Sequence, residues 1–212
     1  MLNIHAASMA EPYPPGSGKF ESDYRTDAGD YYHNTFGVQV VPVALIDRAD
    51  NGGRYPVYRP QWQNFINQQI NKPLEVDLKL KLDYDTNTNK LCAFTQAEFL
   101  TSKTGNFNVC MYIVEDSIVD WQENYSVTGD PNYPIGDVSN YMHRHLFRGT
   151  IGNILGAQAA SGNISQGQKF VNTFGFDFTG KNWNKNKIYI IAYIYDANTK
   201  EVFQTVEKHL IE

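Results

Sequence analysis

Two histidines placed two residues apart, His143 and His145, are the most unusual arrangement of reactive side chains in this chain. Residues i and i+2 of an extended strand share a face, so the two imidazoles could hold one metal ion. The sequence supplies no evident third ligand, since the spacing gives no reason to pair Asp137 with them. The alternatives are a catalytic role and a structural one, in which Arg144 and Arg148 pair with carboxylates on the opposite face. We therefore expect no cofactor and keep His143 and His145 as the metal candidates.

Cys92 and Cys110 are the only cysteines. They form no C-x-x-C pair and have no histidine spacing typical of a zinc site. Three interpretations stay open: two buried free thiols, a cross-strand disulfide formed in an oxidising compartment, or one reactive thiol. The disulfide is allowed because both residues flank a loop between neighbouring predicted strands.

Three carboxylates, Glu115, Asp116 and Asp120, follow an apolar stretch. Paired carboxylates can act as acid and base or bind calcium, but no D-x-[DN]-x-[DN]-G loop is present, and such residues are common at strand ends. No serine lies in a G-x-S-x-G motif, and the glycines of residues 149–156 match neither a phosphate loop nor the dinucleotide fingerprint. The sequence thus contains no complete catalytic constellation and predicts a protein that is not an enzyme.

Composition limits the partners. The 212 residues carry 18 Lys plus Arg against 23 Asp plus Glu, a formal charge of -5, which disfavours nucleic acid. No window approaches the roughly 20 apolar residues of a membrane helix, and the first residues lack the basic and apolar regions of a signal peptide. Trp121 and Trp183 could line a carbohydrate or peptide surface, although such rings more often fill a core.

The secondary structure expected to position these side chains changes near residues 71–73, from mixed strands and helix to strands and turns. Before that point we expect a short buried strand over residues 2–6, a hairpin of residues 38–47 and 54–58 around an Asn-Gly-Gly turn, and a helix over residues 61–70. One or two helical turns are expected within residues 20–36, interrupted by Gly29. One stripe of the 61–70 helix should be buried: Trp62, Phe65, Ile66 and Ile70.

The remainder reads as strands and turns. Residues 74–83 alternate apolar and charged side chains, which predicts a strand with one buried face. About seven short antiparallel strands suggest a two-sheet sandwich of immunoglobulin-like type. Beyond residues 74–83 the expected strands are residues 90–100, 107–115, 141–148, 168–178, 187–196 and 201–209.

On these residues the chain resembles the twenty-eight-kilodalton outer membrane protein family of Bacteroidetes. In the sandwich, residues 114–122 resemble the family's ED-x-(hydrophobic)-x-x-x-Q segment and residues 141–148 its hxHxxR strand. Trp183, residues 188–196 and residues 201–202 are similar to its closing hairpin. The first part resembles the later half of a thioredoxin-like domain at residues 4–7, 31–32, 36–38, 41–42 and 47–48.

The resemblance implies an α+β fold of two parts. Residues 1–72 would be an incomplete thioredoxin-like domain and residues 73–212 an immunoglobulin-like β-sandwich. Pro42 would occupy the cis-proline position. The family's first strand and C-x-x-C helix have no counterpart here, so thiol exchange does not carry over. We expect residues 2–6 and 41–46 either to belong to an incomplete domain or to meet directly.

The resemblance also implies a location and a class of activity. It suggests a cell-envelope protein, at the outer membrane or cell surface, that binds a protein or a glycan there and is not an enzyme. Membrane association would come only through a lipid anchor upstream of this sequence. The alternative is a truncated thiol-disulfide oxidoreductase lacking its redox motif. Residues 116–118 resemble the D-S/T-hydrophobic sequon for O-glycosylation, which makes Ser117 a modification candidate.

Overall fold

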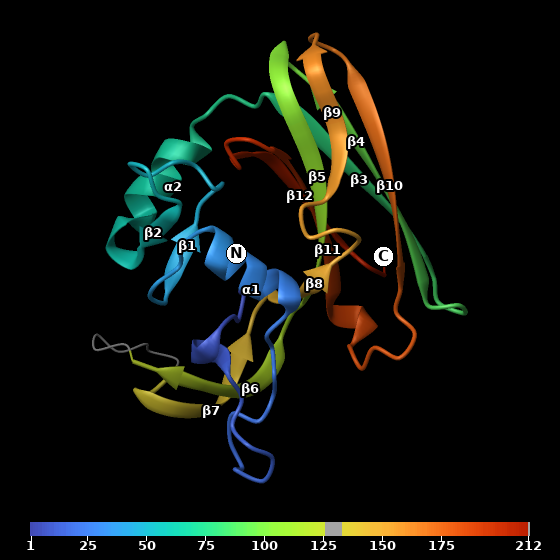
Figure 1. The fold of residues 1–212 in the computed structure, drawn as a ribbon. Helices are drawn as coiled ribbons and strands as arrows, with labels where there is room; N and C mark the ends of the chain where they lie inside the picture. The colour runs from blue at the N-terminus through green and yellow to red at the C-terminus, as the bar shows by residue number, and fades with distance from the viewer. Residues whose placement is uncertain (126–132, 212) are drawn as a thin grey trace.

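The computed structural model describes residues 1–125 and 133–211, and β-strands dominate it (Figure 1). Two antiparallel sheets face each other as a sandwich. The smaller sheet has the strand order β10-β4-β3, formed by β3 (Val76–Asp85), β4 (Lys90–Phe99) and β10 (Lys169–Asp177). The alternation expected for the first strand is confirmed, because Val76, Leu78 and Leu80 are buried.

The larger sheet is built around one long strand, β5 (Lys103–Glu115). The order is β12-β11-β5-β8, and β9 pairs with the other half of the β5 edge that β8 (Leu146–Thr150) uses. The remaining strands are β9 (Ala157–Ile164), β11 (Ile188–Asp196) and β12 (Val202–His209).

Both faces of the larger sheet are covered. Side chains such as Val109, Met111 and Ile113 of β5 face the smaller sheet and form the main core. Their neighbours Cys110 and Tyr112 point the other way, into a second core. This is why β5 is an almost continuous buried run, a pattern typical of strands packed on two sides.

The second core is closed by α1 (Asp27–Thr35), which lies across the outer face of the larger sheet (Figure 1). The helix begins where the Thr26 hydroxyl accepts a hydrogen bond from the Gly29 amide, at 3.0 Å. Sequence reasoning treated Gly29 as an interruption, but it lies inside the helix. A Cβ there would come within 3.0 Å of the Ile4 side chain, so glycine permits the close approach.

A small satellite unit follows α1. The hairpin β1 (Val43–Leu45) and β2 (Pro56–Tyr58) is antiparallel, as expected, and α2 (Trp62–Ile70) matches the expected helix. The expected buried stripe is only half right, because Ile66 and Ile70 are 39% and 75% exposed. Short 3-10 helices lie at Ser8–Ala10, Arg59–Gln61 and Lys185–Lys187.

The strand expected over residues 2–6 is not formed. Instead Asn3 makes an isolated parallel bridge with Leu146, and His5 makes one with Arg25. Of the two alternatives expected for residues 2–6 and 41–46, a direct meeting is therefore wrong, because the backbone of Asn3 pairs with β8. The Val41–Pro42 peptide bond is cis, the geometry that the resemblance implied for Pro42.

A separate hairpin, β6 (Ile118–Asn124) and β7 (Gly136–His143), lies apart from the sandwich, at the bottom of Figure 1. The single strand expected over residues 141–148 is wrong. It is broken after His143, because His145 adopts a left-handed backbone with φ +47° before β8 begins. The break sends the two candidate histidines into different surroundings.

Candidate functional site

His143 and His145 do not share a strand face. His143 ends β7 and is 2% exposed, whereas His145 lies in the turn that follows and contacts Asp116 and Glu207, with N–O distances of 3.1 and 3.3 Å. Among residues 1–125 and 133–211, no group of three His, Cys, Asp or Glu side chains is placed to hold a metal ion. The proposed two-histidine metal site therefore lacks its geometric basis.

His143 instead belongs to an aromatic cluster. Its ring centroid lies 5.4 Å from that of His5, 5.6 Å from Tyr24 and 4.9 Å from Tyr141. Its Nε2 atom is 3.3 Å from the carbonyl oxygen of Trp121. Burial, followed by the proximity of His143, lowers the pKa of His5 to about 4, and burial lowers that of His143. Both rings are thus neutral at pH 7 and anchor the N-terminal segment.

Asp116, Ser117 and His145 are the residue types of a hydrolase triad, but their connections differ. The Ser117 hydroxyl donates to Asp116 at 2.6 Å, and Asp116 in turn contacts His145, so serine and histidine are not hydrogen-bonded. The Ser117 Oγ atom also accepts from Arg144 at 2.8 Å. A nucleophilic serine needs a base within hydrogen-bond reach of its own hydroxyl. This arrangement supplies none.

The three candidate carboxylates have separate partners. Arg148 pairs with Glu115 at 2.8 Å and Arg144 pairs with Asp116 at 3.0 Å, which confirms the expected arginine–carboxylate pairing. Tyr24 donates to Asp120. Burial acts to raise the pKa of Asp116, but hydrogen bonds from the Ser117 hydroxyl, the His145 amide and Arg144 lower it to about 2. The carboxylates do not converge on one site.

Ser117 lies in the turn between β5 and β6, partly exposed, with φ +56°. Its hydroxyl is occupied by Asp116 and Arg144. O-glycosylation there stays a prediction, which a mass shift on the peptide from native material would test.

Both cysteines are free thiols, so of the three interpretations the disulfide is not formed in this structure. Cys110 lies in the core beneath α1, on the outer face of the larger sheet. Cys92 alternates with the core residues Leu91 and Ala93 and therefore points outward from the smaller sheet. The thickness of the sandwich, about 10 Å between sheets, separates the two thiols.

An arginine to which the sequence analysis gave no role beyond the thioredoxin-like resemblance, Arg48, lies in the core beneath α1. The Nη2 atom of Arg48 donates to the hydroxyls of Tyr112 and Tyr193, each at 2.8 Å. Its guanidinium carbon lies 4.9 to 5.5 Å from the ring centroids of four aromatic side chains: Tyr32, Phe36, Tyr193 and Tyr195. Within the described residues no carboxylate pairs with it. The contacts fix residues 47–48 to the sandwich.

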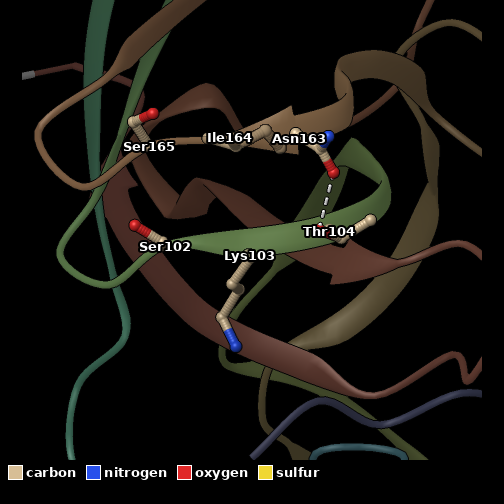
Figure 2. Close-up of a pocket in the computed structure, with 6 residues that line it drawn as sticks. All are labelled: Ser102, Lys103, Thr104, Asn163, Ile164 and Ser165. Atoms are coloured by element: carbon tan, nitrogen blue, oxygen red, sulfur yellow. Dashed lines mark hydrogen bonds between the residues drawn. The ribbon is translucent and has the colours of Figure 1, made fainter.

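One surface hollow, of about 240 Å³, lies where the start of β5 meets the end of β9 (Figure 2). Three of its small polar side chains are already paired: the Thr104 hydroxyl donates to Asn163 at 2.9 Å, and the Ser102 hydroxyl accepts from the Gln166 amide at 3.1 Å. The Lys103 side chain points away from that pair, and its ammonium contacts Glu75 at 2.9 Å and the ring of Phe203. This hollow leaves little chemistry free for a ligand.

A second hollow, of about 380 Å³, lies between the end of α1 and β2 and is the better candidate. We call it the Tyr58 hollow. Phe36 is buried and contacts the ring of Tyr55, while Tyr58 is 41% exposed. Arg54 and Gln39 also line the hollow. Neither side chain makes a hydrogen bond or ion pair within the described part of the chain. The volume lies within the roughly 300–1,000 Å³ typical of ligand sites.

The comparisons with known proteins are consistent with the resemblance. The model of the family described as outer membrane protein Omp28 matches residues 29–212. The chain belongs to the Omp28 family. A crystal structure of a domain of the outer membrane lipoprotein Omp28 from Porphyromonas gingivalis is similar, with 18% identity over 64% of this chain and 88% of that chain, and a TM-score of 0.39. No curated protein matches.

Membership of the Omp28 family places the protein in the cell envelope, at the outer membrane. In the part of the chain that the structure describes, no helix combines the length and the apolar character needed to span a membrane. The Omp28 match includes every lining residue of the Tyr58 hollow but not His5 or Tyr24.

Proposed function

We propose that this Omp28-family protein is a non-enzymatic contact protein of the cell envelope that binds a protein or a glycan at the cell surface. The observation that carries the proposal is the Tyr58 hollow. It combines an exposed aromatic ring with a guanidinium and an amide that have no partner in the described residues. Sites of this composition recognise ligands by ring contact and a few directed hydrogen bonds.

Contacts with neighbouring elements hold the floor of the hollow in place. The Tyr55 ring contacts Phe36, and its hydroxyl donates to the carbonyl of Thr199 at 3.2 Å. The floor is therefore held by both α1 and the β11–β12 turn. Tyr58, on β2, is held in register opposite Val43 of β1. A rigid floor with free groups at its rim favours binding, since less order is lost when a ligand arrives.

We also propose a fold type for each of the two parts of the chain. We assign residues 73–212 to an immunoglobulin-like sandwich and residues 1–72 to a thioredoxin-like unit, supported by the facing sheets and by the β1–β2–α2 unit with Pro42. The rival hypothesis, a thiol-disulfide oxidoreductase, receives less support. Burial raises the pKa of Cys110 to about 11, opposite to the lowered pKa of a reactive thiol.

The test is to apply the purified chain to a glycan array and a peptide array in parallel, together with Tyr58→Ala. The proposal expects saturable binding on at least one array, reduced about tenfold or more by Tyr58→Ala. Absence of binding on both arrays, or binding that Tyr58→Ala leaves unchanged, would contradict it. Circular dichroism checks that the variant is folded.

A further inference from the structure

The rim of the Tyr58 hollow carries an exposed guanidinium, that of Arg54, on an acidic protein. The chain has a formal charge of -5. Yet Arg54, which lines the hollow, is exposed and its side chain has no ion pair within the described residues; Arg59, also exposed and without an ion pair there, lies beyond β2 and outside the lining. The nearest acidic residue in sequence, Asp50, uses its carboxylate to accept a hydrogen bond from the Gly53 amide at 2.7 Å. A guanidinium without an ion pair favours an anionic group on the ligand.

Arg54 differs from Arg59 in its position. Arg54 lines the hollow, whereas Arg59 does not. A guanidinium can donate two parallel hydrogen bonds to one carboxylate, which gives direction as well as charge. A carboxylate held by Arg54 would place the rest of the ligand against the rim that Tyr58 and Gln39 form.

The remaining lining fits a sugar ring. The Tyr58 side chain offers an aromatic surface, and the Gln39 amide can both donate to and accept from hydroxyls. Gly53 lies at the rim with φ +80°, and a Cβ placed there would meet no atom within 4 Å, so the space beside it is open. An apolar ring face together with several hydroxyl groups is the surface that a saccharide presents.

We infer that the Tyr58 hollow binds a carboxylate-bearing sugar, with Arg54 holding the carboxylate and Tyr58 the ring. The inference rests on the proposed function and specifies its ligand. It commits to an acidic glycan rather than to a peptide carboxyl terminus.

The probes are a disaccharide ending in glucuronic acid and its counterpart ending in glucose, titrated calorimetrically against the intact chain. We expect the acidic probe to bind about tenfold more tightly than the neutral one, the difference a charged hydrogen-bond pair provides. Arg54→Gln should remove that preference, and Arg54→Lys should restore part of it. Tyr58→Ala should weaken both probes, and the matched control Arg59→Gln should change neither by more than about twofold.

The possible outcomes distinguish a failure of this inference from a failure of the proposed contact function. Equal affinity for the two probes, or a preference that survives Arg54→Gln, overturns the inference. Binding confined to the peptide array also overturns it, although the proposed contact function then stands. Loss of binding on every array contradicts both.

Discussion

The rings of His5 and His143 lie 5.4 Å apart, one from the N-terminal segment and the other from the end of β7. The charged or titratable groups around the pair are Tyr24, Tyr141, Asp120 and Arg148. Tyr24 stays protonated, because burial and its hydrogen bond to Asp120 raise its pKa to about 12. Two imidazoles so close cannot both take up a proton without repulsion, so their contact depends on pH.

The first prediction is a loss of stability in mild acid. The pKa of His5 falls from 6.5 to about 4 on folding, so the unfolded chain binds a proton more readily. The contribution of neutral His5 to the free energy of unfolding is therefore fully present above pH 6.5. It is lost as the pH falls toward 4, which lowers the free energy of unfolding by on the order of 2 to 3 kcal/mol. The change in His143 has the same sign. Urea unfolding at pH 7 and pH 5 measures the difference.

The control for this prediction is a pair of variants. His5→Phe with His143→Phe should flatten the dependence between pH 7 and pH 5. His33→Gln, at an imidazole of α1 that contacts the adjacent Asn34 and lies outside this aromatic cluster, is the matched control. Asp116, with its pKa near 2, contributes only at lower pH. An unchanged slope in the double variant would show that the two rings are not the cause.

The second prediction concerns Arg48. Arg48→Ala removes two hydrogen bonds from a charged donor and the contacts with four aromatic rings, and we expect it to lower the free energy of unfolding by about 2 to 4 kcal/mol. Arg48→Lys should recover less than half, because an ammonium lacks the planar fork. Arg59→Ala, at an exposed arginine, should stay within about 0.5 kcal/mol. Equal effects of Arg48→Ala and Arg59→Ala would refute a structural role for the guanidinium.

How far the sequence could predict this molecule depends on the range of the interactions. The alternation from Val76 to Leu80 and the periodicity of α2 are local, and they predicted β3 and the helix correctly. The β8 edge that pairs with Asn3 lies more than 140 residues away, so no local pattern could show it. A left-handed His145 likewise gave no signal in its own residue type, since glycine or asparagine usually marks such positions.

The candidate site shows the same limit. In the sequence Arg48 contributed only to the thioredoxin-like resemblance, although the tyrosines at positions 193 and 195 of a largely apolar strand indicated hydroxyl groups on a buried face. The Tyr58 hollow is formed by the end of α1 and by β2, and no motif joins them in the sequence. Its lining residues became a candidate only through their tertiary proximity.

The third prediction isolates a steric requirement. At Gly156, φ is +75°, and a Cβ would lie 2.2 Å from the Val109 carbonyl oxygen and 2.7 Å from the Cys110 sulfur. We expect Gly156→Ala to destabilise the protein by about 3 kcal/mol or more. Gly162→Ala is the matched control: φ is +83° there, but nothing lies within 4 Å, so about 1 kcal/mol of backbone strain remains. Thermal or urea unfolding compares them, and equal losses would rule out the clash.

The fourth prediction follows from the positions of the two thiols. Cys92 is partly exposed on the smaller sheet, whereas Cys110 is buried beneath α1 with its pKa raised to about 11 by that burial. A thiol reagent at pH 8 should therefore label Cys92 in the folded protein, and label Cys110 only after unfolding, because the thiolate is the reactive form. Mass spectrometry of the labelled peptides makes the assignment, with Cys92→Ser as the control that abolishes native-state labelling. A disulfide between the two in protein kept under oxidising conditions, with the fold retained, would contradict their placement on opposite faces of the sandwich.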